Sequence, residues 1–197
     1  MYPIVLKLEN SPCLIVGGGT VAERKVLGLL QAGANVTIIS LSLSKGLEVL
    51  RDEGRIHHID RAYKEGDSSK YRLVVAATDD RKLNHLIFRE AESHGTLVNC
   101  VDDPDNCNFF VPSVTRRGNL LLAISTSGTV PALAKALRKF FEKKFYPEFS
   151  EDLEELRTVR KAILREREPD RQQKVQDSAQ ILQQKIDAII SKMEKLC

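Results

Sequence analysis

Short apolar runs alternate along this chain with longer segments in which apolar residues recur every three or four positions. The runs predict strands over residues 14–16, 36–39, 56–59, 71–77 and 96–100. The periodic segments predict helices over residues 20–32, 43–51 and 81–93. Gly33 and Gly95 follow two of these helices, where helices commonly end. Strands that alternate with helices in this way predict a parallel sheet covered on both faces.

The pattern changes after residue 108. Residues 109–115 and 120–125 have the pattern of two strands, and Arg116-Arg117-Gly118-Asn119 between them is typical of a hairpin turn. We expect this antiparallel hairpin at one edge of the parallel sheet, because parallel sheets commonly carry antiparallel strands there. Pro131 then begins a helix that extends to about residue 145, and Pro147 ends it.

Residues 147–197 contain neither glycine nor a strand pattern. Ser150 is suited to cap a helix, and Asp170 restarts the helical pattern after Pro169. An apolar heptad seam then consists of Val175, Ala179, Leu182, Ile186, Ile189 and Met193. Such a seam packs either on its own domain or on a helix of a second copy, and we expect a homodimer.

The sequence therefore predicts an α/β protein with a Rossmann-like parallel sheet, an antiparallel edge hairpin and an all-helical C-terminal region. We expect three parts. The first domain spans residues 1–112, the hairpin and its helix span residues 113–146, and the helical domain spans residues 147–197.

The composition argues against several classes of protein. The chain has 30 Lys and Arg against 27 Asp and Glu, and a net charge of +3 is too small to indicate a nucleic-acid partner. No apolar stretch is long enough for a membrane helix and the N-terminus lacks a signal-peptide layout, so we expect a cytoplasmic protein with no membrane partner. Neither the four cysteines nor the four scattered histidines have the spacing of a metal site. Cys13 and Cys100 lie in apolar runs and are expected to be buried, reduced thiols.

The junction between the first strand and the first helix carries the strongest chemical signal. Gly17, Gly19 and Ala22 form the pattern G-x-G-x-x-A. In dinucleotide-binding folds the first glycine permits the turn, the second leaves room for a pyrophosphate, and the N–H groups that open the helix bind its charge. We expect the cofactor to contact Gly17, Gly18, Gly19, Thr20, Val21 and Ala22. The alternative is that these small residues serve close packing alone.

Polar residues follow the later strands of the sheet. Thr78 and Asp79 follow one strand, Asn99 lies at the end of the next, and residues 125–128 follow the last. Ligands of open parallel sheets bind beyond the carboxyl ends of the strands, so we expect all three segments to rim one crevice.

Four ordered blocks of this sequence resemble the precorrin-2 dehydrogenase family, of the siroheme-synthase N-terminal type. The resemblance covers nearly the first 145 residues. The blocks are the glycine turn with Val21-Ala22-Glu23-Arg24-Lys25; Ala76-Ala77-Thr78-Asp79-Asp80 with Asn84; Asn99-Cys100-Val101-Asp102-Asp103 with Phe109 and Pro112; and Ala123-Ile124-Ser125-Thr126-Ser127-Gly128 with Pro131, Leu133, Ala134 and Arg138.

Members of this family oxidise precorrin-2 to sirohydrochlorin with NAD, and some also insert ferrous iron to give siroheme. The resemblance implies that NAD is the cofactor, that precorrin-2 is the substrate and that Asp102 is the catalytic carboxylate. From the residues alone, Asp102 and Asp103 could equally be turn residues before Pro104. A tetrapyrrole rich in carboxylates needs cationic partners. The residues expected to bind it are Asn99, Arg116, Arg117, Ser125, Thr126, Gly128, Lys135 and Arg138.

Two positions depart from the usual patterns. Ser40 ends the second strand, where dinucleotide folds often carry an acid that binds the adenosine ribose. A serine can still hydrogen-bond a ribose hydroxyl, so Ser40 is expected to contact NAD, and Lys45 nearby leaves NADP as an alternative. Thr126 and Ser127 replace a serine and a glycine that some relatives carry in the fourth block.

Two other functions remain open at this point. One is a non-catalytic dinucleotide-binding redox sensor with a dimerising helical tail. A sensor has no need to combine residues 99–103 and 125–128 with a basic patch. The other is a dehydrogenase of another kind, for which the expected helical Tyr-x-x-x-Lys pair and a suitably placed histidine are missing.

Overall fold

A computed structural model of the chain describes residues 1–101, 103–165 and 172–195. The chain divides into two compact units, Met1–Phe110 and Val111–Cys197. The elements of the first unit are β1 (Pro12–Val16), α1 (Thr20–Gln31), β2 (Asn35–Ser40), α2 (Lys45–Asp52), β3 (His57–Asp60), β4 (Leu73–Ala76), α3 (Arg81–Ser93), β5 (Leu97–Cys100) and the short 3-10 helix η1 (Pro104–Asn106). Every predicted strand and helix of this unit is present.

The five strands of the first unit form one parallel sheet in the order β3-β2-β1-β4-β5. Successive residues of β1 point to opposite faces, so Cys13 and Ile15 pack with α1 and α2, whereas Leu14 and Val16 pack with α3. Burial on both faces explains the uninterrupted apolar run of this strand. The predicted Rossmann-like sheet is confirmed. The strand order reverses between β1 and β4, and ligands of such sheets bind at this switch point.

The antiparallel hairpin is present, but it is not an extension of the parallel sheet. β6 (Ser113–Arg117) and β7 (Leu120–Ile124) pair only with each other. The outer edge of β5 is covered instead by residues 107–109. Asn108 donates its backbone N–H to the carbonyl oxygen of Val98 at 3.1 Å, and its side-chain oxygen accepts from the N–H of Val98 at 2.8 Å. The predicted edge position of the hairpin is therefore wrong, because this edge has its partner already.

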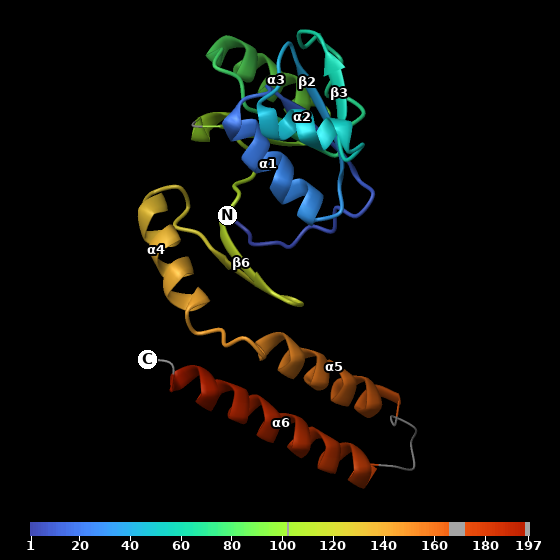
Figure 1. The fold of residues 1–197 in the computed structure, drawn as a ribbon, viewed down its shortest axis with the longest axis vertical. Coiled ribbons are helices and arrows are strands. Elements are labelled where there is room, and N and C mark those ends of the chain that lie inside the picture. The colour runs from blue at the N-terminus through green and yellow to red at the C-terminus, as the bar shows by residue number, and fades with distance from the viewer. Residues whose placement is uncertain (102, 166–171, 196–197) are drawn as a thin grey trace. The chain divides into compact units, whose positions relative to one another are not determined.

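The second unit contains the hairpin and three helices. α4 (Pro131–Glu142) packs on β6 and β7, and α5 (Phe149–Arg165) packs on α6 (Gln172–Glu194). The two long helices run in opposite directions (Figure 1). Lys185 pairs with Glu155 at 2.5 Å, and Lys192 pairs with Asp152 at 2.8 Å. Because α5 begins at Phe149, Ser150 lies inside the helix and is not the predicted N-cap.

The heptad seam of the tail finds its partner within the chain. Of its residues, Leu182, Ile186 and Met193 are partly buried, Ile189 is buried and Ala179 is exposed, and α6 packs on α5. On α5, Ile163 is buried as well. The side chain of the seam residue Val175 lies outside the described part of α6, and Pro169 and Asp170 lie outside the described residues. For the described seam residues from Leu182 to Met193, α5 takes the place that a helix from a second copy would take.

None of the helices described by the structure has the length and apolar character needed to cross a membrane.

Candidate functional site

The glycine turn between β1 and α1 is shaped by two close backbone approaches. Gly17 has φ +111°, and a Cβ there would overlap the carbonyl group of Ala77. A Cβ at Gly18 would overlap the carbonyl oxygen of Ser42 and lie 3.0 Å from its carbon. A Cβ at Gly19 would meet nothing within 4 Å. The first two glycines are therefore required by the fold, and the third leaves open space beside the helix.

The N-terminus of α1 has no side-chain cap among the described residues. Its N-cap residue is Gly19, whereas Ser44 caps α2 and Asp80 caps α3 through side-chain oxygen atoms. Thr20 is exposed and Val21 is half-buried at this end, whereas Ala22 is fully buried against the sheet. Uncapped N–H groups and the positive end of the helix dipole attract an anion. The open space at Gly19 and this helix end together fit the pyrophosphate of a dinucleotide.

The loop between β2 and α2 packs on the same turn. Ser44 donates its N–H to the carbonyl oxygen of Gly18 at 2.7 Å. Ser40 donates its hydroxyl to the carbonyl oxygen of Ser42 at 2.8 Å, and its oxygen lies 3.3 Å from His58 Nε2. The Ser40 oxygen can still accept a hydrogen bond, so its predicted contact with a ribose hydroxyl is chemically available.

The end of β4 is held by a buried amide. Asn84 of α3 accepts the hydroxyl of Thr78 at 2.7 Å and donates to the backbone carbonyl of Thr78 at 2.9 Å. Asp80 caps α3 by accepting the N–H groups of Lys82 and Leu83. Asp79, which lies between Thr78 and Asp80 in the sequence, is exposed. Of the predicted pair, Thr78 is thus fixed by the protein, and Asp79 presents its carboxylate at the edge of the sheet.

Asn99 connects three segments at the end of β5. Its side-chain oxygen accepts from Lys25 Nζ of α1 at 3.1 Å, and its amide nitrogen donates to the carbonyl oxygen of Phe109 at 3.2 Å. The side chain is buried, so we assign it a structural role in addition to its predicted place at the substrate. This partner of Lys25 could not be predicted from the sequence, because the contact joins residues 74 positions apart. Asp102, the predicted catalytic residue, lies outside the described residues.

Cys13 and Cys100 are buried and free, as expected, and Cys107 is a third free thiol of the described chain. Burial raises the pKa of the Cys13 thiol to about 11 and that of the Cys100 thiol to about 12. Burial also raises the pKa of Cys107. These protonated thiols are poor nucleophiles and poor metal ligands at neutral pH.

The remaining predicted substrate residues lie in the second unit. Arg116 and Arg117 are neighbours on β6, and neighbouring side chains of a strand point to opposite faces, so one face of the hairpin presents only one of them. Lys135 and Arg138 lie three positions apart on α4, on one side of the helix. Arg138 forms an ion pair with Glu142. The positive charge of Arg138 is therefore partly neutralised by Glu142, and Lys135 is the better placed of the two to bind a substrate carboxylate.

The loop that precedes α4 is built from polar small residues. Ser127 and Gly128 have positive φ angles of 55° and 81°. Ser125 accepts the N–H of Ser127 at 3.1 Å, and the hydroxyl of Thr126 accepts the N–H of Val130 at 3.1 Å. The Thr126 oxygen thus supports the entry into α4. Glycine is favoured at position 128 because of its backbone angle.

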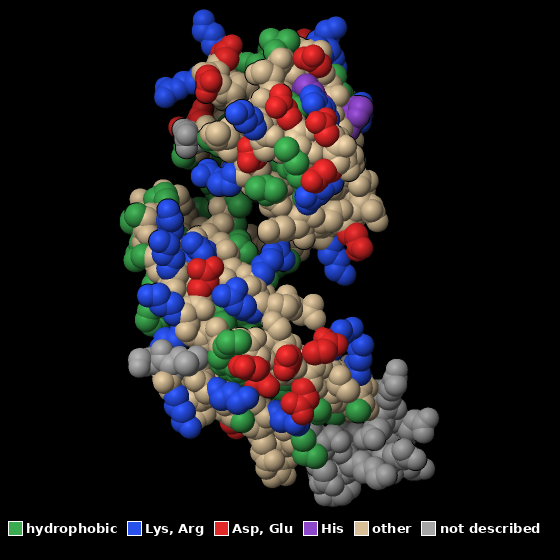
Figure 2. Space-filling view, in the orientation of Figure 1, with side chains coloured by type: hydrophobic (Ala, Val, Ile, Leu, Met, Phe, Trp, Pro, Cys, Tyr) green, Lys and Arg blue, Asp and Glu red, His purple; other side chains and the backbone are tan. Residues whose placement is uncertain are grey.

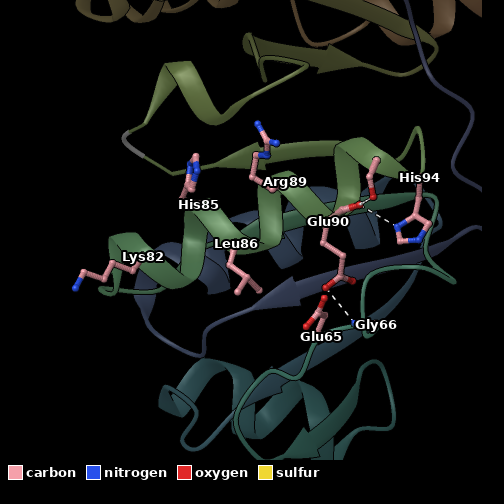
Figure 3. A pocket seen from close by; sticks show the side chains of 9 residues that line it. Glu65, Gly66, Lys82, His85, Leu86, Arg89, Glu90 and His94 are labelled. Carbon is pink, nitrogen blue, oxygen red and sulfur yellow. Dashed lines mark hydrogen bonds between the residues drawn. The ribbon is translucent and has the colours of Figure 1, made fainter.

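A surface hollow of about 750 Å³ lies along the outer side of α3 and was not predicted. Lys82, His85, Arg89 and His94 surround it (Figure 3). Glu90 and Gly66 also line it, and the carboxylate of Glu90 accepts the N–H groups of Gly66 at 3.0 Å and Ser68 at 3.1 Å. In residues 1–101, 103–165 and 172–195 no cluster of three or more histidine, cysteine or acidic side chains is placed to hold a metal ion.

Comparisons with known proteins identify relatives of this chain. A family model described as “Putative NAD(P)-binding” matches residues 4–113. The siroheme synthases of Methylobacillus flagellatus and Methylococcus capsulatus are 45% and 46% identical to the chain over 140 residues, which is 71% of this chain and 30% of each relative. The chain thus spans about 30% of the length of these relatives. Among solved structures, SirC, a precorrin-2 dehydrogenase, matches 99% of this chain and 100% of its own with a TM-score of 0.77 and 25% identity.

Proposed function

Because this chain belongs to the precorrin-2 dehydrogenase family of the siroheme-synthase N-terminal type, whose matched domain binds NAD(P), we propose that it oxidises precorrin-2 to sirohydrochlorin with NAD. The observation that carries this proposal is the likeness to a precorrin-2 dehydrogenase over the full length of both chains. The uncapped helix end beside Gly19 supports it independently, because it offers a place for the pyrophosphate.

Each proposed role follows from the chemistry of the residues. NAD, when bound, supplies the acceptor for the hydride that leaves the macrocycle. The N–H groups at the start of α1 hold the diphosphate, and Asp79 stands exposed at the same edge of the sheet. Forming the new double bond also releases a proton, so a carboxylate base is needed, and we assign this role to Asp102, which follows β5 by two residues.

Precorrin-2 carries many carboxylates, and the second unit supplies cations for them. Lys135 of α4 and one of Arg116 and Arg117 are the proposed partners. Arg138 can join them only by sharing its guanidinium with Glu142. The loop of Ser125, Thr126 and Gly128 adds hydroxyl and backbone groups.

The test is anaerobic incubation of the purified chain with precorrin-2 and NAD, with absorption recorded until sirohydrochlorin forms. We expect Asp102→Ala to abolish turnover while NAD binding, measured by calorimetry, is unchanged. Asp105→Ala is the matched control, because it removes the same charge from an exposed position in η1. If Asp102→Ala turns over at the wild-type rate, Asp102 is not the base.

The same experiment separates the alternatives. We propose insertion of ferrous iron, the substrate of the second reaction in some family members, as a further activity of this chain. Adding ferrous iron after the oxidation should then convert the sirohydrochlorin spectrum to that of siroheme. A redox sensor would bind NAD and NADH but leave precorrin-2 unchanged.

We also propose that two copies of this chain associate through α4. Its exposed side includes Leu133 and Phe140, which are 48% and 54% exposed. Figure 2 shows apolar and basic side chains gathered over α4. Apolar side chains this exposed gain free energy when a partner covers them. Sedimentation of the wild type as a dimer and of Phe140→Glu as a monomer is the expected result, and Lys139→Glu, an exposed neighbour, serves as the charge control.

A further inference from the structure

A carboxylate from α1 occupies the N-terminus of α2. Ser44, the N-cap of α2, donates its hydroxyl to Glu23 Oε2 at 2.5 Å. Gly46 lies in the first turn of α2, and a Cβ at this position would overlap the Glu23 carboxylate, with Oε2 only 2.7 Å away. Glu23 therefore lies against the first turn of α2, where the helix dipole stabilises a negative charge.

The loop that holds Glu23 is the loop that contacts the glycine turn. The N–H of Ser44 donates to the Gly18 carbonyl at 2.7 Å, so the hydroxyl and the N–H of one residue join the Glu23 carboxylate to the expected coenzyme site. In dinucleotide folds the adenosine ribose lies at the end of the second strand, which here is Ser40. The 2′ position of that ribose is therefore expected close to this loop.

Without Glu23, this loop would suit a phosphate. It carries the hydroxyls of Ser42 and Ser44, the ammonium group of Lys45 and the N-terminus of a helix. These groups are the usual partners of the 2′-phosphate of NADP. In the structure the Ser44 hydroxyl is donated to Glu23, so the anion position is filled by the protein's own carboxylate.

We propose that Glu23 makes the coenzyme site selective for NAD by occupying the position that the 2′-phosphate of NADP would take. A neutral ribose hydroxyl can lie beside a carboxylate and donate a hydrogen bond to it. A 2′-phosphate would instead face a like charge in a half-buried place and would lose the Ser44 hydroxyl as a donor. The inference rests on the proposed binding of a dinucleotide at the glycine turn, and it supplies the acid that the end of β2 lacks.

The experiment measures coenzyme affinity and needs no tetrapyrrole. NAD and NADP are titrated by calorimetry into the wild-type chain, Glu23→Gln and Glu48→Gln. Removing one charge near a phosphate is expected to change the affinity about tenfold. We therefore expect Glu23→Gln to tighten NADP binding about tenfold and to alter NAD binding by less than about threefold. Glu48, an exposed acid in the first turn of α2, is the matched control, and its variant should keep the wild-type ratio.

Gly46→Ala tests the same idea without removing the acid. The added methyl meets the flexible end of Glu23 rather than backbone, so it displaces the carboxylate, and alanine also favours the helix. We expect this variant to be at least as stable as the wild type and to shift the coenzyme ratio toward NADP. Glu23→Asp, which keeps the charge, should retain the preference for NAD.

An unchanged NADP to NAD ratio in both Glu23→Gln and Gly46→Ala would overturn this inference and leave the proposed function intact. An equal loss of affinity for NAD and NADP would also overturn it, because Glu23 would then only hold the loop in place. If the wild type bound neither coenzyme, the inference and the proposed function would both fall.

Discussion

Alanine substitutions at two adjacent glycines should have different effects, one on the stability of the fold and the other on the binding of NAD. Gly18 and Gly19 are neighbours in the same turn, yet a methyl group on Gly18 would overlap the backbone of Ser42, whereas one on Gly19 would enter open space. Gly18→Ala and Gly19→Ala add the same methyl group to the chain. Any difference between them therefore comes from the surroundings of each residue.

The structure gives the size of each effect. The Gly18 methyl meets the backbone carbonyl of Ser42, which no rotamer can move, so the loop must shift, and this loop also makes the 2.7 Å hydrogen bond from Ser44 to Gly18. Overpacking of this kind costs about 1–3 kcal/mol, which lowers the melting temperature of a domain this size by roughly 5–15 °C. Gly19 has φ −81°, an angle that alanine also adopts. Alanine is an inferior N-cap, which destabilises the helix, but it also lowers the entropy of the unfolded chain, which stabilises the fold. Each effect is about 0.5–1 kcal/mol, so the two largely cancel.

Thermal unfolding followed by circular dichroism, together with calorimetric titration of NAD, provides the measurement. We expect Gly18→Ala to melt well below the wild type, and Gly19→Ala to melt within a few degrees of it while binding NAD at least about tenfold more weakly. Wild-type melting of Gly18→Ala would refute the close approach of Ser42. Wild-type NAD affinity in Gly19→Ala would refute the placement of the pyrophosphate.

Three further predictions concern groups inside the first unit. Because burial raises the pKa of Cys13 to about 11 and that of Cys100 to about 12, iodoacetamide at pH 8 should label both thiols only after unfolding, as mass spectrometry would detect. The hydrogen bond from Arg61 lowers the pKa of Asp67, so Asp67→Asn should lower the free energy of unfolding at pH 7. This difference from the wild type should disappear as the pH falls below about 4, where Asp67 becomes protonated. An equal loss of unfolding free energy at both pH values, measured by urea unfolding, would contradict this prediction. Asn84→Ala removes both bonds to Thr78 and should cost about 1–3 kcal/mol in the same assay, while Asn119→Ala, an exposed control, should cost little.

The elements of the first unit could be predicted because their signals are local. The helix expected over residues 81–93 is found as α3 with the same bounds, since Asp80 caps its beginning and Gly95, with φ +68°, follows its end. The apolar run of residues 14–16 needs helices on both faces, and the sheet supplies them. Such local signals established the fold class and the glycine turn.

The errors concern contacts between residues far apart in sequence. The hairpin was expected at one edge of the parallel sheet because such sheets commonly carry antiparallel strands there, yet the amide of Asn108 satisfies the backbone of the β5 edge. Gly18 occupies a variable position of the dinucleotide pattern, and its constraint comes from Ser42 in the next loop. Neither contact has a periodic or spacing signal that a single sequence could reveal.

The same contacts decide which polar residues of the family blocks are free to bind a ligand. A buried amide that already accepts and donates inside the protein gains little by turning to a ligand, because the bonds that it gives up are left unpaired. Asn84 and Asn99 are of this kind, since Asn84 joins two segments of the fold and Asn99 joins three. The start of α1 is the opposite case, because its N-cap is a glycine that offers no side-chain acceptor. Among the described residues of the first unit, the groups free to bind a ligand should therefore be sought at the helix end and at the exposed Asp79, with the two asparagines keeping these groups in place.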